Sequence, residues 1–196
     1  MNNAQEKSAG RPSDSGIRIE TERLILRNVA PKDAAVMFDY RNNALCAKYQ
    51  RGQRKAYADI CELIERRKND VLSVEAPFMI AVAQKRSDEM IGEIVVMPKA
   101  GTISIGYTFH YNYHRKGYAF EALTALLALL HEAFPSWGFV SFTEPENIAS
   151  MALLTKLGYQ NMGYLPTMAS QVFCKWLPPA EEAELARAIR GGECIS

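Results

Sequence analysis

The chain has 196 residues, 48% of them hydrophobic and 23% charged, and its formal net charge is +1. This length and composition fit one globular domain with a sizeable core rather than two small domains. The near-zero net charge gives no general attraction to polyanions, so we expect neither nucleic acid nor a membrane as a partner.

The ends of the chain differ from its centre. Residues 1–17 predict a flexible tail, because they are polar, rich in Ser, Gly and Asn, and lack the apolar segment of a signal peptide. The domain should span residues 18–178, and residues 179–196 should form a C-terminal helix and tail. The most apolar helical run, residues 122–130, is too short to cross a bilayer. These features predict a cytoplasmic protein, with monomer and homodimer both open.

The cysteines are far apart in the sequence and form neither a CxxC pair nor a cluster with histidine. We therefore expect reduced thiols, no disulfide framework and no metal site. The four are Cys46, Cys61, Cys174 and Cys194.

Short strands and helices alternate in the first half of the chain. Apolar β-branched runs predict strands, and an apolar period of three to four residues predicts helices. The polar, basic segment 42–54, with Tyr49 near its middle, either borders a substrate pocket or is a solvated connection. The expected elements are a strand at 24–27, helices at 31–41 and 55–68, and a hairpin of strands at 78–82 and 90–97.

The stretch 102–134 joins a strand to the longest amphipathic helix. Apolar and polar residues alternate from Thr102 to Phe109, and from Ala119 onward apolar residues recur every three or four positions. A basic turn containing Gly117 lies between these segments. The first N–H groups of a helix bind anions when the backbone can approach closely. The turn therefore predicts either a phosphate cradle or an ordinary helix start with surface cations.

The second half continues with a strand at 139–143, a helix and a last strand at 171–176. Asn147 is a suitable N-cap for this helix, and Gly158 suits a left-handed residue after its C-terminus. The order of elements predicts a mixed α/β single domain.

Five sequence blocks, taken together with their order and spacing along the chain, resemble the GNAT acetyltransferases, specifically the ribosomal-protein-alanine N-acetyltransferase branch. The resemblance covers roughly residues 19–176. It implies an α+β fold with a mixed, mostly antiparallel sheet of about six to seven strands flanked by helices. The fourth and fifth strands should be splayed by a bulge. The blocks are residues 20–28, 31–40, 91–94, 105–122 and 146–159.

The resemblance also implies acetyl-CoA as cosubstrate and no metal. Its pyrophosphate should lie over the turn that ends at Ala119, and its pantetheine arm and thioester oxygen should meet the preceding strand. At the first position of the turn the family usually has Gln or Arg, whereas this chain has His114. The implied cofactor-binding residues are Tyr107, Thr108, His114, Arg115, Lys116, Gly117, Tyr118, Ala119, Asn147 and Ser150.

The implied chemistry is direct attack by a neutral amine, which needs a base and a proton source for the CoA thiolate. Many members of this branch have Glu before the Ile-Gly-Tyr segment, where this chain has Ser104. Glu93 and Glu144 can replace that base, or each can be a surface charge. Ser150 matches a hydroxyl position near the sulfur, while Leu154 stands where some relatives have a catalytic Tyr.

The acceptor is predicted from amine acidity. An α-amine with a pKa of about 7.8 is roughly one-seventh neutral at pH 7, whereas a lysine amine near 10.4 is almost entirely charged. A site without the usual base therefore suits the α-amine of a peptide or protein, or a small molecule with a similarly acidic ammonium. The alternative is a GNAT-fold module that binds acetyl-CoA without turnover.

Overall fold

A computed structural model describes residues 16–50 and 56–191, so residues 1–15 of the predicted tail lie outside it. One eight-stranded sheet runs through the described chain in the order β1-β2-β3-β4-β5-β6-β8-β7. All neighbouring pairs are antiparallel except β5–β6. The strands are β1 (Arg18–Glu20), β2 (Leu24–Arg27), β3 (Phe78–Gln84), β4 (Met90–Lys99), β5 (Thr102–Phe109), β6 (Gly138–Thr143), β7 (Gln160–Leu165) and β8 (Ser170–Lys175).

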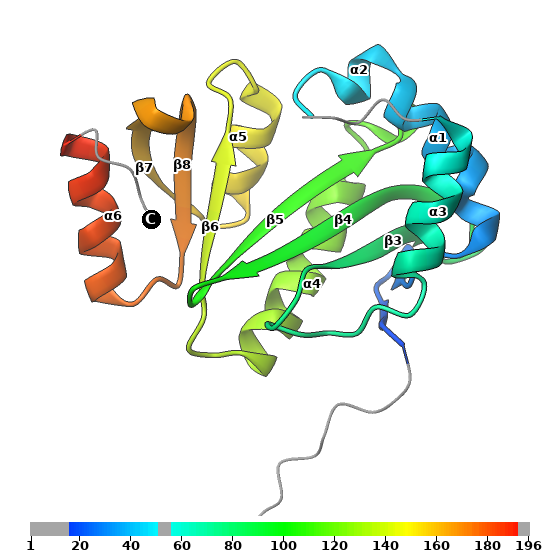
Figure 1. The fold of residues 1–196 in the computed structure, drawn as a ribbon, viewed down its shortest axis with the longest axis horizontal. Coiled ribbons are helices and arrows are strands. Elements are labelled where there is room, and N and C mark those ends of the chain that lie inside the picture. Colours follow the sequence, from blue (N-terminus) through cyan, green and yellow to red (C-terminus); the bar gives the residue numbers. More distant parts are fainter. Residues whose placement is uncertain (1–15, 51–55, 192–196) are drawn as a thin grey trace, which may run out of the picture.

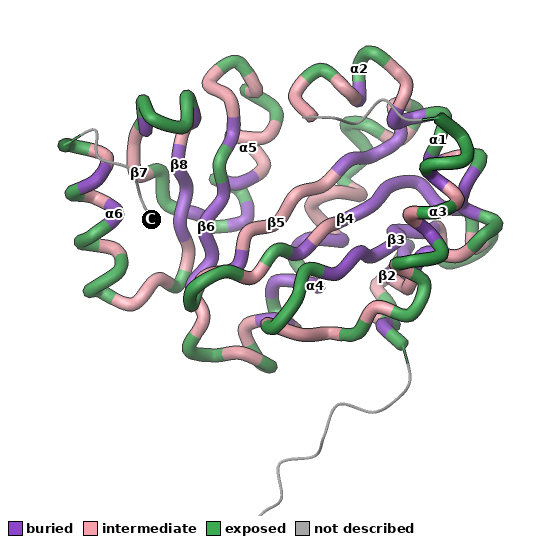
Figure 2. Tube along the Cα trace, in the orientation of Figure 1, coloured by how far each residue is buried: buried purple, intermediate pink, exposed green. Residues whose placement is uncertain are grey.

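Helices cover both faces of this sheet (Figure 1). On one face α4 and α5 pack against a large apolar core, while α1 and α3 cover part of the other face and α6 lies over β6, β8 and β7. Figure 2 shows that burial follows the central strands and the inward sides of these helices. The helices are α1 (Ala34–Asn42), α2 (Ala44–Ala47), α3 (Tyr57–Arg67), α4 (Tyr118–Ala133), α5 (Ile148–Lys156) and α6 (Pro179–Gly191).

The sheet opens between β5 and β6. These two strands are paired only at Thr102↔Gly138 and Ile103↔Phe139, after which they diverge, with α5 and α2 on either side of the opening (Figure 1). β5 and β6 are the strands predicted as the fourth and fifth, so the predicted splay is present. The expected bulge is absent, because β4 and β5 pair without interruption from Lys99↔Thr102 to Gly92↔Phe109. From Ser104 onward the β6-facing edge of β5 has no partner strand.

Most predicted elements are present with small boundary changes. Asn147 caps α5, since its Oδ1 accepts from the Ser150 N–H at 3.2 Å, and Gly158 follows that helix with φ of 81°. The start predicted for the second helix falls partly on residues 51–55, outside the described chain, and α3 begins at Tyr57. No helix in the described part of the chain is long and apolar enough to span a membrane.

Three elements were missed because local sequence does not specify them. The three residues of β1 and the four of α2 are too few to establish a period. The sequence of β7 includes Asn161 and Gly163, which are unfavourable in strands. Pairing with β8 forms β7 despite this composition, with a register shift between Asn161 and Gly163.

Candidate active site

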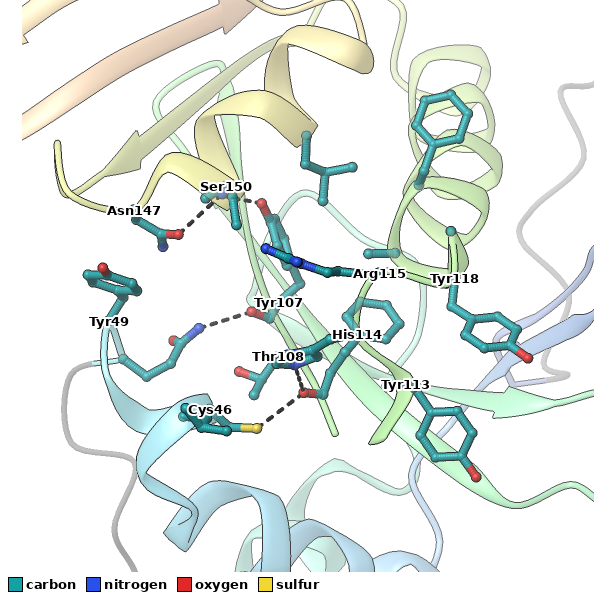
Figure 3. A pocket seen from close by; sticks show the side chains of 18 of the residues that line it. Cys46, Tyr49, Tyr107, Thr108, Tyr113, His114, Arg115, Tyr118, Asn147 and Ser150 are labelled. Atoms are coloured by element: carbon teal, nitrogen blue, oxygen red, sulfur yellow. Dashed lines mark hydrogen bonds between the residues drawn. The ribbon is translucent and has the colours of Figure 1, made fainter. Parts of the chain in front are cut away.

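A cavity of about 450 Å³ occupies the opening beside β5 (Figure 3). The β5 residues Tyr107 and Thr108 form its floor. On one side lie the start of α4 and the first turns of α5, which we call the helix-start wall. On the other side lie Leu45, Cys46, Tyr49 and Gln50 in and after α2, which we call the α2 wall. The cavity thus brings together segments about 100 residues apart in sequence.

The helix-start wall is shaped by the backbone of the turn before α4. Arg115 and Gly117 both adopt left-handed conformations, with φ of 59° and 81°. Gly117 is the N-cap of α4 and offers no side-chain cap. The first N–H groups of α4 therefore keep the anion-binding capacity and positive dipole of a free helix start. A side chain on Gly117 would be strained at this φ, and its Cβ would lie 3.4 Å from Arg23 Nη2.

Arg23 and Glu121 brace this turn from outside the cavity. Arg23 Nε donates to Glu121 Oε2 at 2.6 Å, and Arg23 Nη1 donates to the Lys116 carbonyl at 3.1 Å. Glu121 Oε1 also accepts from the Thr21 hydroxyl at 2.6 Å. Burial alone would raise the pKa of Glu121, but the hydrogen bonds from Thr21 and Arg23 outweigh it and lower that pKa. The carboxylate form therefore ties the turn between β1 and β2 to the first turn of α4.

A hydroxyl pair joins β5 to α5 inside the cavity. Tyr107 Oη and Ser150 Oγ lie 2.8 Å apart, and Asn147 fixes the Ser150 backbone through its cap bond. Figure 3 shows these three side chains together on one side of the cavity. Burial raises the pKa of Tyr107, outweighing the hydrogen bond with Ser150. Tyr107 therefore stays protonated at neutral pH and can pass a proton through Ser150.

The α2 wall is fastened across the opening by side chains. Cys46 Sγ donates to the Phe109 carbonyl at 3.3 Å, and Gln50 Nε2 donates to the Tyr107 carbonyl at 2.9 Å. Tyr49 Oη donates to the Glu146 carbonyl at 3.0 Å. Residues 45–50 therefore border the pocket rather than forming a solvated connection. The polar segment around Tyr49 hinted at this position, but nothing in the sequence identified Cys46 or Gln50 as lining residues.

The lining of the cavity is cationic. Arg115 and Lys156 line it, with Lys156 Nζ 4.2 Å from the centre of the Phe120 ring, and no Asp or Glu of the described chain does so. All the predicted cofactor-binding residues except Lys116 line the cavity. Lys116 instead lies near Tyr113, with its Nζ 5.6 Å from the ring centre. His114 lines the cavity with its Nε2 2.8 Å from the Phe109 carbonyl oxygen.

The predicted carboxylates lie elsewhere. Glu93 is only 2% exposed and faces α1, where its Oε1 accepts from Arg41 at 2.6 Å and its Oε2 accepts from Tyr40 at 2.9 Å. Strand alternation places Glu93 on this face, so the expectation that it meets the acceptor directly gains no support. Glu144 follows β6, where its carbonyl accepts from the Asn147 N–H at 2.9 Å.

Ser104 pairs with Met97 between β5 and β4, and neither Ser104 nor Glu144 lines the cavity. In the described part of the chain, no group of three or more His, Cys, Asp or Glu side chains is placed to hold a metal ion. The chemistry available in the cavity comes from hydroxyls, amides, backbone groups and cations, together with the Cys46 thiol and the His114 imidazole.

An open sheet edge beside a free helix start defines a site suited to an extended, phosphate-bearing substrate. Residues 23–160 match the Acetyltransferase (GNAT) domain model. The chain therefore belongs to the GNAT family, and it is an N-acetyltransferase with acetyl-CoA as its cosubstrate.

Individual relatives agree with this assignment. The uncharacterized N-acetyltransferase YnaD of Bacillus subtilis is 28% identical over 150 residues, which cover 76% of this chain and 85% of that protein. A GNAT-family acetyltransferase from Bacillus anthracis shares the fold with a TM-score of 0.70 and 23% identity, over 81% of this chain and 96% of that one. RimL, a ribosomal L7/L12 α-N-protein acetyltransferase solved with coenzyme A, shares it with a TM-score of 0.68 and 14% identity, over 82% and 98%.

Proposed function

We propose that this protein moves the acetyl group of acetyl-CoA to the primary α-amine of a peptide or protein N-terminus, or to a small-molecule amine of similar acidity. The amine attacks the thioester directly and forms a tetrahedral intermediate. No covalent acyl-enzyme is involved. The observation that carries the choice of acceptor is that no carboxylate lines the cavity in the described chain.

The acetyl-CoA half of the proposal rests on the helix-start wall and the free edge of β5. The backbone from Arg115 to Ala119 would hold the pyrophosphate, because its helix N–H groups and left-handed turn favour an anion. The pantetheine arm contains two amides, which can pair with an unpaired strand edge as an added strand would. That edge, around Tyr107 and Thr108, would also supply N–H donors to the thioester oxygen.

The acceptor half rests on charge. A polyamine or a lysine-rich peptide would meet Arg115 and Lys156 with no acidic partner in the cavity. An α-amine reaches its neutral form at neutral pH far more readily than a lysine amine does, so it needs less help from a base. RimL acts on the α-amine of a ribosomal protein, which makes this class of acceptor a natural first test.

The proposed reaction forms the amide C–N bond and breaks the thioester C–S bond. The amine proton leaves to water, because Glu93 is engaged by Arg41 and Tyr40. The departing thiolate takes a proton from Ser150, Ser150 recovers one from Tyr107 over the 2.8 Å contact between their hydroxyls, and solvent returns a proton to Tyr107.

The test uses the full chain with acetyl-CoA and equimolar peptides whose only free amine is either terminal or on lysine, at several pH values. Mass spectrometry should find the terminal amine acetylated preferentially at neutral pH. Preference for the lysine peptide would overturn the choice of acceptor. Binding of CoA without thiol release from acetyl-CoA, across a mixed panel of amines, would instead favour a non-catalytic acetyl-CoA-binding module.

A further inference from the structure

We propose that Gln50 is an acceptor-binding residue, whose side-chain carbonyl oxygen Oε1 accepts a hydrogen bond from the amine that attacks the thioester. This inference rests on the proposed function and adds a residue to its acceptor side. Gln50 lines the cavity from the α2 wall, and its Nε2 donates to the Tyr107 carbonyl at 2.9 Å. Within the described chain no donor is bonded to Gln50 Oε1, although Nε2 of the same carboxamide is held by the Tyr107 carbonyl.

The segment that presents Gln50 is held at three points. Cys46 contacts the Phe109 carbonyl, Tyr49 contacts the Glu146 carbonyl, and Gln50 itself contacts β5. These bonds reach β5 on one side of the opening and the segment between β6 and α5 on the other. The Gln50 carboxamide is thus oriented by its donor end and keeps its acceptor end for another group, which limits the entropy lost when an amine binds.

The bond to Tyr107 is compatible with cosubstrate binding at the same strand edge. A backbone carbonyl oxygen has two lone pairs and can accept two hydrogen bonds. The Phe109 carbonyl already contacts both Cys46 Sγ and His114 Nε2, at 3.3 and 2.8 Å. Gln50 therefore need not leave Tyr107 when acetyl-CoA occupies the edge of β5.

An amide oxygen suits this position better than a carboxylate does. A carboxylate beside the amine would favour the ammonium form and raise the pKa of the amine, leaving less of the neutral nucleophile. An uncharged amide oxygen accepts an N–H from the neutral amine without that strong bias, and the nitrogen lone pair stays available for attack. This choice fits a cavity whose described lining residues include no Asp or Glu.

The experiment compares Gln50→Leu with wild type, using the preferred terminal-amine peptide and acetyl-CoA. Losing one hydrogen bond should raise the acceptor KM about 3- to 10-fold. The dissociation constant for CoA, measured by calorimetry, should stay within about twofold, because one net hydrogen bond to the cosubstrate would change it more. The matched control is Gln84→Leu, the same change in β3, where the side chain contacts Ser87 and does not line the cavity.

A second variant, Gln50→Glu, preserves size and adds charge. It should move the acidic limb of the kcat-against-pH profile to higher pH, because the carboxylate holds the bound amine as ammonium. A merely structural role for Gln50 would leave that limb in place. An unchanged acceptor KM in Gln50→Leu, or weakened CoA binding as its only effect, would overturn the proposal while leaving the proposed function standing. A wild-type protein that binds CoA but acetylates no amine would overturn both.

Discussion

The two walls of the cavity are built by different means. The helix-start wall is made mainly of backbone, with two left-handed residues and a helix start held from behind by Arg23 and Glu121. The α2 wall is made of side chains that reach β5 and the start of α5. Because any acyl-CoA presents the same phosphates and amides, a backbone cradle would suit the cosubstrate that we propose for this wall. The side-chain wall is the part that can vary with the acceptor without changing the fold.

The ion pairs behind the two walls differ in how deeply they are buried. Arg41 and Glu93 are 6% and 2% exposed, and they anchor the helix that leads into the α2 wall. Arg23 and Glu121 are 42% and 18% exposed. Solvent screens the second pair far more than the first, so removing a partner from each should have very different effects on stability.

The largest expected effect comes from Glu93→Ala, which leaves Arg41 buried without its carboxylate. The free energy of unfolding should fall by about 3–5 kcal/mol in urea denaturation. In the wild type the attraction of Glu93 outweighs burial and raises the pKa of Arg41. The Glu93→Ala variant loses that attraction, but a guanidinium is not deprotonated in proteins, so a buried, unpaired charge remains.

The matched variant Glu93→Gln keeps a hydrogen-bonding side chain of the same size and should lose less stability. If Glu93→Gln instead abolished turnover while leaving stability unchanged, Glu93 would be a catalytic base rather than the anchor of the α2 wall.

Ser150→Ala tests the proton path between the β5 floor and the helix-start wall. The variant should lower kcat about 10- to 100-fold, because the thiolate loses its donor, while the acetyl-CoA KM changes much less. Tyr107→Phe should also lower kcat, because it removes the hydroxyl that lies 2.8 Å from Ser150 Oγ. Equal kcat values for Ser150→Ala and wild type would exclude this path.

The sequence predicted the helix-start wall much better than the α2 wall, and the reason is physical. A turn suited to an anion combines a residue such as Gly117 with a helix immediately afterwards, so its residues lie together in the sequence. Gln50 and Tyr107 are brought together only by the tertiary fold. The sequence likewise could not decide which face of the sheet Glu93 occupies, and its contacts with Arg41 and Tyr40 settle that question. Short elements such as β1 and α2 depend on partners rather than on local periodicity.

Gly117→Val tests the backbone cradle. Its β-branched side chain would be strained at φ of 81° and would crowd the approach of a phosphate, so CoA affinity should fall about tenfold or more. Gly101→Val is the matched control, because Gly101 has φ of 79° but its added Cβ would meet nothing within 4 Å. Both variants should lose similar stability, and only Gly117→Val should weaken CoA binding in calorimetry. Unchanged CoA affinity in Gly117→Val would show that the cradle lies elsewhere.

The smallest effect is expected from Glu121→Gln, which tests the brace behind the helix-start wall. The pKa of Glu121 is lowered in the folded protein, so its carboxylate stabilises the fold above the unfolded pKa of about 4.3, and this contribution disappears as pH falls through the lower folded pKa. At pH 7 the variant should be about 1 kcal/mol less stable than wild type, since the pair is partly exposed. The difference should shrink toward zero in acid and in high salt. Glu132→Gln, an exposed change near the other end of α4, should not show this pH dependence. A stability difference that persisted below pH 3 would mean that side-chain shape, rather than charge, ties the β1–β2 turn to α4.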